Sequence, residues 1–234
     1  MQRLDKLLSS LGYASRRDVP ALCKSGRVRD RAGNPITKAE TRVNAADILL
    51  EGKELDHKEG IFIVMHKPVG YTCSHDSSEG ELIYDLLPER WWSRNPVPSS
   101  IGRLDKETSG VLLITDQGQW IHRLASPKHH VDKVYIADLD RPLDAATVDA
   151  FASGTLLLND DNTPCLPATL EILSERQARV TLTEGRYHQV RRMFAACGNH
   201  VLHLHRQAFG SYTVKDLAPG EWRDVPDPSG KLFS

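Results

Sequence analysis

Four leucines recur at helical spacing near the start of the chain. At i, i+3, i+4 and i+7 they place one apolar stripe along a helix, and Gly12 follows directly as a stop signal. The four are Leu4, Leu7, Leu8 and Leu11. The pattern predicts an amphipathic helix that buries this stripe in a small core.

A second helix is predicted after residue 15. Ser15, with Asp18 three residues later, resembles a capping box, and Gly26 ends the helix. Pro20 lies near the end of the first turn, where its missing N–H begins to matter, so we expect a local distortion there. Residues 32–56 alternate short apolar runs with turn residues, which indicates short strands and turns.

The rest of the chain alternates strand and helix patterns. Short apolar runs predict strands over residues 61–65, 111–115, 134–139, 168–173, 178–183 and 201–205. Helix-forming patterns cover residues 119–125, 145–152 and 188–197. This is an α+β pattern, for which we expect a mixed, largely antiparallel sheet with flanking helices.

A linker separates two parts of different character. Residues 54–60 (ELDHKEG) are polar and charged almost throughout, which is typical of a connection between domains. We therefore predict a boundary near residue 58, with a small N-terminal α/β domain over residues 1–58 and a larger domain over residues 59–234.

Charge is unevenly distributed along the chain. Residues 1–31 contain eight Lys or Arg and three Asp or Glu, a balance of +5, so the remainder carries −6 within the net charge of −1. A basic head on an acidic body predicts a localised surface for a polyanion such as nucleic acid. A solvated charged surface without a ligand explains the same count equally well.

Composition excludes several classes of protein. The longest apolar runs are too short for a signal peptide or a membrane span. The four cysteines are far apart in the sequence, which indicates free thiols rather than a zinc site or a redox pair. They are Cys23, Cys73, Cys165 and Cys197. We expect a cytoplasmic protein that does not bind a membrane.

The first candidate for chemistry is residues 101–110 (IGRLDKETSG). This loop precedes an apolar strand, which is a rigid place to mount a reactive group. Asp105 could act there as a nucleophile, a general base or a turn former. Composition alone favours the turn former, because Asp is a common turn residue.

The second candidate is residues 184–194 (EGRYHQVRRMF). A glycine turn leads into a helix whose His188, Arg191 and Arg192 lie on the face opposite its apolar residues. Such a cluster near a helix start suggests recognition of a phosphate or a carboxylate. An exposed basic helix face is an equally good interpretation.

The third candidate is residues 200–206 (HVLHLHR), which contain three histidines. In a regular strand His203 and His205 share one face, and the two leucines share the other. Carboxylates and cysteines are missing at ligand spacing beside these histidines. A structural role is therefore favoured over a metal site.

Several motifs together resemble those of one enzyme family. GRLDKETSG with the following VLLIT and DQG, then KVYIADL, then EGRYHQVRRM resemble in order the motifs of the pseudouridine synthases that include enzymes of both ribosomal subunits. QRLDKLL, ASRRDV and CKSGRV resemble the S-four-like RNA-binding domain. The resemblance spans nearly the whole chain and implies an N-terminal RNA-binding domain joined to a catalytic domain.

The resemblance also implies a set of site residues. Asp105 matches the essential aspartate of the family, Tyr135 the tyrosine that stacks on the target base, and Arg191 the basic residue that pairs with the aspartate. Arg103 matches an arginine implicated in base extrusion. The other residues expected to bind RNA are Arg16, Arg17, Lys24, Arg27, Arg29, Arg186, His188 and Arg192.

The function implied is isomerisation of a specific uridine in ribosomal RNA to pseudouridine. WIHRLASPKHH and GNHVLHLHR resemble the branch of the family that modifies small-subunit ribosomal RNA. The expected partner is that RNA or a small-subunit assembly particle, bound by a monomer, and neither DNA nor a membrane. The reaction involves no redox change, so we expect no cofactor and no metal. Attack of Asp105 on the sugar and removal of a proton by Asp105 both stay open.

Two other functions fit parts of the pattern. A ribosome assembly factor without catalysis would use the N-terminal domain only to hold RNA. A glycosidase or nucleosidase would use Asp105 and Glu107 as paired carboxylates, although their spacing within one loop is poor for flanking a bond.

Overall fold

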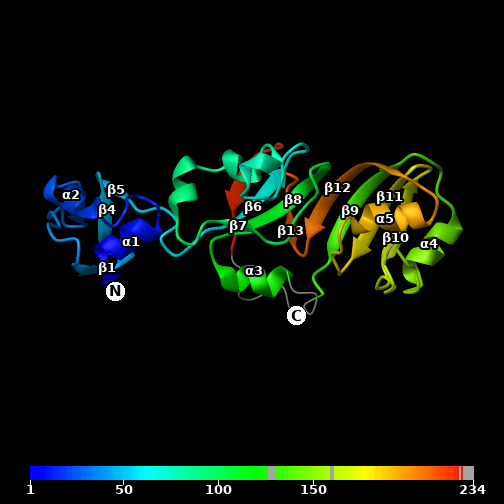
Figure 1. The fold of residues 1–234 in the computed structure, drawn as a ribbon, viewed down its shortest axis with the longest axis horizontal. Helices are drawn as coiled ribbons and strands as arrows, with labels where there is room; N and C mark the ends of the chain where they lie inside the picture. Colours follow the sequence, from blue (N-terminus) through cyan, green and yellow to red (C-terminus); the bar gives the residue numbers. More distant parts are fainter. Residues whose placement is uncertain (126–129, 159–160, 227, 229–234) are drawn as a thin grey trace. The chain divides into compact units, whose positions relative to one another are not determined.

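The structure is a computed structural model that describes residues 1–125, 130–158, 161–226 and 228. The chain forms two compact units, and Figure 1 shows their elements coloured along the sequence. The first unit comprises residues 1–62, 87–99 and 115–118, and the second comprises residues 63–86, 100–114 and 119–234. The first unit thus contains all of the expected N-terminal domain together with two later segments, and the boundary near residue 58 stays a prediction.

Two helices and two small sheets make up most of the first unit. β1 pairs with β3, and a second sheet has the order β2–β4–β5. The elements are β1 (Gln2–Arg3), α1 (Leu4–Ser10), α2 (Val19–Lys24), β2 (Val28–Asp30), β3 (Arg42–Val43), η1 (Ala45–Asp47), β4 (Ile48–Leu50), β5 (Lys53–Glu54) and η4 (Glu89–Ser93). The predicted leucine stripe is confirmed, because its four side chains are at most 5% exposed and belong to the core of this unit.

The second helix begins later than the sequence predicted. The hydroxyl of Ser15 does donate to the carboxylate of Asp18 at 2.5 Å, but residues 16–18 form a turn and α2 starts at Val19. Pro20 is therefore the second residue of the helix, where the backbone N–H has no helical partner to lose. The expected distortion at Pro20 is wrong for this reason.

A buried ion pair joins the three segments of the first unit. Arg94 and Asp116 are 3% and 8% exposed, and the guanidinium donates to one carboxylate oxygen through two nitrogens, at 2.9 and 2.7 Å. The other carboxylate oxygen accepts the N–H of Ile61 at 2.7 Å. Arg94 also donates to the carbonyl of His57 at 3.0 Å. Asp116, the first residue of the DQG segment, thus connects the three segments of this unit.

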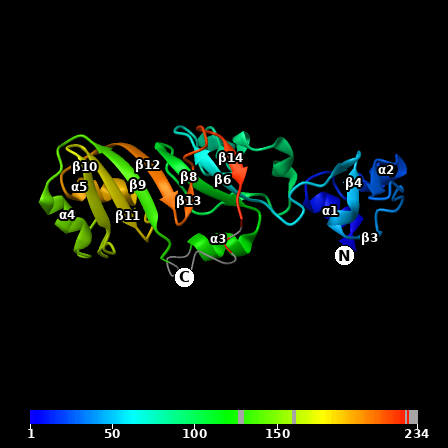
Figure 2. The same ribbon diagram turned by 180° about the vertical axis from the view of Figure 1, so that it is seen from behind.

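A nine-stranded sheet forms the frame of the second unit. Its order is β10–β11–β9–β12–β8–β6–β14, with β13 paired to β12 and β7 paired to β8 (Figure 2). The strands are β6 (Phe62–Lys67), β7 (Ser99–Ser100), β8 (Thr108–Thr115), β9 (Lys133–Leu139), β10 (Thr169–Ser174), β11 (Gln177–Leu182), β12 (Val201–Phe209), β13 (Tyr212–Thr213) and β14 (Trp222–Asp224). Neighbours from β10 to β12 are antiparallel, whereas β12 and β8 are parallel. The predicted α+β class with a mixed, largely antiparallel sheet is confirmed.

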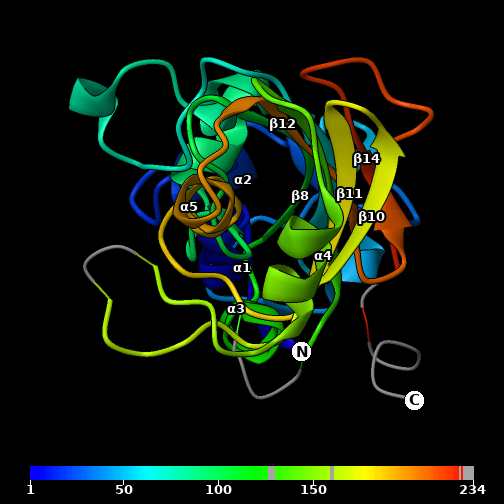
Figure 3. The same cartoon turned by 90° about the vertical axis from the view of Figure 1, so that its right-hand side faces the viewer.

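The helices of the second unit lie where the sequence placed them. The bounds of α3 (Gly118–Ala125), α4 (Ala145–Ala152) and α5 (Gln189–Ala196) differ from the predicted ones by at most one residue. Figure 3 shows α5 on one face of the sheet, and its Phe194 meets Phe151 of α4 with ring centroids 4.8 Å apart. Two short 3₁₀ helices are η2 (Ser77–Glu79) and η3 (Ile83–Leu86).

One sequence motif extends past the described residues, and the described helices fall short of a membrane span in length or hydropathy. The WIHRLASPKHH motif continues beyond α3 into residues 126–129, which lie outside the described residues. Within the described residues, every helix is too short or too polar to cross a membrane.

Strand β12 departs from the regular alternation that the sequence predicted. Its pairing with β9 shifts by one residue between Val201 and His203 and again between Arg206 and Ala208. The first shift, a β-bulge, places Val201 and Leu204 on the same buried face and leaves Leu202 51% exposed. The prediction that both leucines share a face is therefore wrong, because a bulge interrupts the period of two.

The buried ion pair of the first unit leads to a prediction about stability. Asp116→Ala should lower the free energy of unfolding by about 3–5 kcal/mol, because Arg94 would be left buried without its partner. Arg179 and Glu171 form the control pair, since their side chains are 37% and 56% exposed. Arg179→Gln should cost less than about 1 kcal/mol. Urea denaturation of the full chain measures both, and equal losses would contradict the prediction.

Candidate active site

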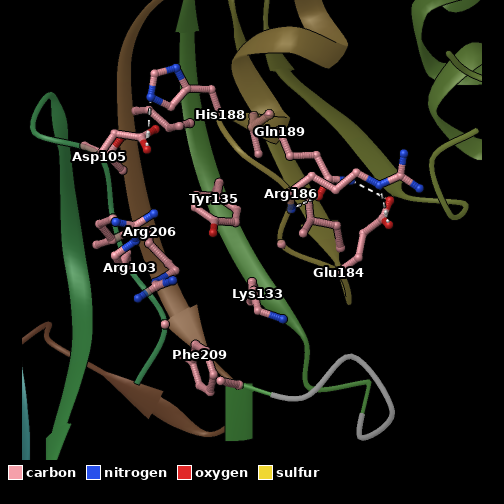
Figure 4. Close-up of a pocket in the computed structure, with 18 of the residues that line it drawn as sticks. Arg103, Asp105, Lys133, Tyr135, Glu184, Arg186, His188, Gln189, Arg206 and Phe209 are labelled. Carbon is pink, nitrogen blue, oxygen red and sulfur yellow. Dashed lines mark hydrogen bonds and ion pairs between the residues drawn. The ribbon is translucent and has the colours of Figure 1, made fainter. Parts of the chain in front are cut away.

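One pocket in the second unit gathers most of the predicted catalytic residues. It has a volume of about 160 Å³ and is formed by the loop before β8, strand β9, the loop between β11 and α5, and strand β12 (Figure 4). Its lining includes Arg103, Asp105, Lys133, Tyr135, Glu184, Arg186, His188, Gln189, Arg206 and Phe209. Pockets that enclose drug-sized ligands measure about 300–1,000 Å³, so this one has room for part of a nucleotide, such as one base.

Asp105 is the first residue of a tight turn at the edge of the pocket. The N–H of Thr108 donates to the carbonyl of Asp105 at 3.0 Å, so backbone groups close the turn. The side chain of Asp105 is 32% exposed and lines the pocket. Asp105 is therefore a turn residue whose carboxylate is still available to a ligand.

Buried Lys67, at the end of β6, holds the loop that carries Asp105. Its side chain is 0% exposed, and its ammonium donates to the carbonyls of Lys106 at 3.3 Å, Thr108 at 2.9 Å and Pro68 at 2.9 Å. Burial lowers the pKa of Lys67 to about 8, and the carboxylate of Asp105 opposes part of this shift. A buried cation thus lies behind the loop that carries Asp105, with backbone carbonyls as its partners.

Arg191 holds the same loop but does not pair with Asp105 as the resemblance predicted. Its guanidinium donates to the carbonyl of Glu107 at 3.1 Å and to that of Val201 at 2.9 Å. These bonds direct the side chain at backbone oxygens of the loop and of β12. The side-chain partner of Asp105 is instead His188, whose Nε2 lies 3.3 Å from Oδ1. A catalytic role for Arg191 stays a prediction.

His188 reaches Asp105 from a left-handed backbone conformation. It is the residue before α5, with φ of 47° and ψ of 34°, a region that costs a non-glycine residue roughly 1–2 kcal/mol. The imidazole side chain is 38% exposed and stacks on Tyr187, with ring centroids 3.8 Å apart. The sequence proposed His188 as an RNA contact, and the structure places it against the candidate catalytic carboxylate.

Strand register places Tyr135 beside Arg206. Tyr135 of β9 is opposite Arg206 of β12, and the two residues are 9% and 2% exposed. Nε of Arg206 donates to the carbonyl of Val111 at 2.8 Å. On its other side Arg206 is in register with Gly110 of β8, where a Cβ would collide with the Arg206 backbone. The glycine that ends GRLDKETSG thus allows β12 to approach, and Figure 4 shows Tyr135 in the middle of the pocket.

Arg186, which the sequence proposed as an RNA contact, is engaged within the protein. Its guanidinium donates to Glu184 at 3.1 Å and to Asp161 at 3.2 Å. It also donates to the carbonyls of Thr163 at 2.7 Å and Pro164 at 2.6 Å. These bonds fix the pocket wall, and a role of Arg186 in RNA binding stays a prediction.

The remaining predicted RNA-binding residues differ in their hydrogen-bond and ion-pair partners within the protein. Arg103 is exposed and lines the pocket, and Arg192 donates to the carbonyl of Tyr187 at 3.3 Å. In the first unit the predicted cations are all exposed, namely Arg16, Arg17, Lys24, Arg27 and Arg29. Arg27 pairs with Glu51, and Arg29 donates to a backbone carbonyl at 2.8 Å. Among the described residues, hydrogen-bond and ion-pair partners are lacking for the other three.

The described residues contain no group of three or more His, Cys, Asp or Glu that could hold a metal ion. The histidines of β12 are not gathered into such a group. His205 is hydrogen-bonded to the hydroxyl of Ser109 at 2.9 Å, and its ring lies 5.5 Å from that of His66. Burial, and to a smaller extent His66, lowers the pKa of His205.

Most of the pocket-lining residues lie within a match to a known family. The profile described as RNA pseudouridylate synthase matches residues 61–196, more than half of the chain. The chain belongs to the RNA pseudouridylate synthase family. The family predicted from the sequence motifs is confirmed, and with it the prediction of an enzyme that isomerises uridine to pseudouridine.

Named relatives of this pseudouridine synthase cover most of its length. It is 41% identical over 212 residues to ribosomal small subunit pseudouridine synthase A of Escherichia coli (strain K12). The matched region covers 85% of this chain and 89% of that protein. The protein of the same name from Pasteurella multocida (strain Pm70) is 39% identical over 225 residues, 95% of each chain. A crystal structure of a pseudouridylate synthase has a TM-score of 0.69 at 33% identity and covers both chains fully.

Sequence reasoning missed three charged residues that line the pocket of this pseudouridine synthase, namely Lys133, Glu184 and Arg206. It also missed Lys67, which holds the loop that carries Asp105. Arg206 could have been found, since it lies two residues after Leu204 in a strand and a charged residue in that position is unusual. Lys133 lies two residues before Tyr135, where burial lowers its pKa to about 8. Burial of Lys67 and Glu184 depends on distant segments, which the sequence pattern does not reveal.

The hydrogen bonds from Lys67 to the loop carbonyls predict that substitution of Lys67 lowers activity. Lys67→Met should reduce pseudouridine formation by at least about tenfold, because two loop carbonyls lose their donor while an apolar side chain of similar length remains. RNA affinity should change little, since Lys67 is buried. Single-turnover assays and RNA titrations measure the two effects. Lys106→Met, at an exposed position of the same loop, is the control and should keep its activity.

The low pKa of Lys67 adds a signature in pH. The folded-state pKa of about 8 is below the usual 10.5, so between these values the unfolded chain binds more protons and stability from this group rises with pH. The free energy of unfolding of the wild type should therefore rise relative to that of Lys67→Met from about pH 8 to about pH 10. A difference that stays flat across this range would contradict the assignment.

Proposed function

We propose that this enzyme converts one uridine of small-subunit ribosomal RNA to pseudouridine, with Asp105 as its catalytic carboxylate. The observation that carries the proposal is the pocket that Asp105, Tyr135 and Arg206 line together. The small-subunit substrate is supported by relatives named ribosomal small subunit pseudouridine synthase A, which are 38–41% identical over most of the chain.

The chemistry requires an ionised carboxylate and no redox partner. The bond between a uracil nitrogen and the ribose is broken, the ring turns over, and a ring carbon takes the place of the nitrogen. Asp105 either adds to the sugar or base, or removes the proton from that carbon. The guanidinium of Arg206 is buried and lines the same pocket as Asp105. Because no electrons are gained or lost, the reaction calls for no cofactor.

The target base has to leave the RNA stack before it reaches Asp105. An enzyme that acts on a base extrudes it and offers it an aromatic surface in exchange. Tyr135 and Phe209 both line the pocket, and Tyr135 is proposed to fill this role. Arg103 is exposed beside the pocket and is proposed to assist extrusion.

The N-terminal domain is proposed to hold the RNA. Its expected extent is residues 1–58, and its first 31 residues carry a balance of +5. Arg16, Arg17 and Lys24 are exposed there and are available to phosphates. The partner is ribosomal RNA, free or within a small-subunit assembly particle, and the protein is proposed to act as a monomer in the cytoplasm.

The arrangement of carboxylates supports isomerisation over the alternatives. Glu107, the carboxylate paired with Asp105 in the glycosidase or nucleosidase interpretation, is exposed and does not line the pocket. Glu184 does line the pocket, but Arg186 and Gln189 bind its carboxylate. A non-catalytic assembly factor has no use for a carboxylate held beside a buried tyrosine and arginine. Mass spectrometry of the RNA separates these functions, since isomerisation leaves the mass unchanged and hydrolysis releases a base.

The role of Asp105 is tested by a substitution that keeps its shape. Asp105→Asn should reduce pseudouridine formation to below about one thousandth of the wild-type rate, because an amide is a poor nucleophile and base. The melting temperature and RNA affinity should stay close to wild type, since the backbone closes the turn. The measurement is pseudouridine content of small-subunit ribosomal RNA incubated with each variant.

A residue of the same loop provides the control for Asp105. Glu107→Gln removes a charge from an exposed position and should retain turnover. Asn favours turns as Asp does, so a purely structural Asp105 would tolerate the change. Near-normal turnover by Asp105→Asn would overturn the catalytic assignment.

The basic surface of the N-terminal domain predicts a salt-dependent contribution to binding. Reversing Arg16 and Arg17 to Glu should weaken RNA binding and reduce the slope of log affinity against log salt concentration by roughly 1–2, because each phosphate contact releases counterions. Filter binding at several salt concentrations measures both quantities. An unchanged affinity together with an unchanged slope would place RNA contact elsewhere.

A further inference from the structure

Tyr187 is the only exposed aromatic side chain in the described part of the chain. It is 71% exposed, whereas every other described Phe, Trp or Tyr is buried or half-buried. Aromatic residues make up only 6% of the sequence, and most of them are used in the core. An exposed aromatic ring forgoes the hydrophobic stabilisation that normally favours burial of such a side chain. Packing within the chain therefore does not account for the position of Tyr187.

The ring of Tyr187 lies next to the candidate active site. One face stacks on the imidazole of His188, with centroids 3.8 Å apart and planes 18° from parallel. His188 in turn lines the pocket and lies 3.3 Å from the carboxylate of Asp105. The order outward from the pocket is thus carboxylate, imidazole and phenol ring, and the second face of the phenol ring is left uncovered.

The ring pair is held in place before any ligand arrives. His188 is fixed in the left-handed conformation at the start of α5. The carbonyl of Tyr187 accepts a hydrogen bond from Arg192 at 3.3 Å, which restrains the same peptide. A surface ordered in advance loses less conformational entropy on binding.

We propose that the open face of Tyr187 stacks on the base of the nucleotide next to the target uridine. The inference rests on the proposed function, because it places the target base in the pocket with Tyr135. A pocket of about 160 Å³ that holds one base leaves the adjacent base outside, at the rim where Tyr187 lies. Stacking that base extends the existing His188–Tyr187 pair by one ring.

The surrounding charges favour RNA as the occupant of this face. Arg192 follows in the first turns of α5, and Arg103 is exposed beside the same pocket. A cation on the helix that follows an open aromatic ring, with a second cation exposed at the pocket, matches a single-stranded nucleotide, which presents a phosphate and a planar base together. Stacking accepts any base, so this contact selects RNA whose neighbouring nucleotide is unpaired rather than one particular sequence.

A double-mutant cycle between protein and RNA tests the contact. The RNA is an oligonucleotide that spans the modified uridine, prepared intact or with an abasic site at the 5′ or the 3′ neighbour. Tyr187→Ala should weaken binding of intact RNA about 5- to 150-fold, the range that corresponds to one base–aromatic stack. Tyr187→Phe should stay within about twofold of wild type, because the ring is kept. Ile172→Ala, at a 43% exposed position of β10, is the control and should bind as wild type does.

The abasic RNA decides between stacking and other roles of the ring. One abasic substrate should weaken wild-type binding as much as Tyr187→Ala does, and Tyr187→Ala should then cost nothing further on that substrate. Additive losses on both abasic substrates would overturn the inference. So would a fall in the rate at saturating RNA with unchanged binding, which would mean that the ring acts only through His188.

The same experiment keeps this inference separate from the proposed function. Pseudouridine formation by the wild-type enzyme on intact RNA reports the proposed function. The coupling in binding reports the stack, and it is read without turnover. Failure of conversion with coupling present would remove the proposed activity and leave the stacking contact. Pseudouridine formation without coupling in binding would leave the proposed activity and remove the stacking contact.

Discussion

Lys67 and Arg191 hold three successive backbone carbonyls of the loop after Asp105, those of residues 106, 107 and 108. Arg206, which lines the pocket, also donates to a carbonyl. Among the described residues none of the three forms an ion pair with a carboxylate. Carbonyls satisfy the donors without cancelling the charge. The positive potential of these three cations is therefore not cancelled by a paired carboxylate, and Arg206 lines the same pocket as Asp105.

The sheet determines which side chains share the pocket. β12 lies between antiparallel β9 and parallel β8, so one strand contacts both the tyrosine motif and the aspartate motif. Arg206 is in register with Tyr135 on one side and with Gly110 on the other. Segments almost a hundred residues apart thus meet at one residue. The remaining wall is built by the bonds of Arg186 and Glu184, which tie the loop before α5 to residues 161–164.

The sequence was most informative where a local pattern decides the structure. The leucine stripe of α1 and the bounds of α4 follow from periodicity alone, and the motifs located Asp105 and Tyr135 in one pocket. The errors arose where distant segments compete for the same group. Arg191 was expected to form an ion pair with Asp105, but its guanidinium donates to backbone carbonyls of the loop and of β12 instead. Lys67 is separated by about forty residues from the carbonyls it serves, and no local pattern encodes such a partner.

The two bulges of β12 have a consequence for how this site tolerates change. Each adds one residue to β12 without adding one to β9, so Val201, Leu204, Arg206 and Phe209 all face the same side at unequal intervals. The direction in which the Arg206 guanidinium points thus depends on how many residues lie between the two bulges, as well as on which residues they are. Residues such as Leu202 can change in chemistry at little cost because they face outward. The length of this segment cannot change by even one residue without redirecting the arginine.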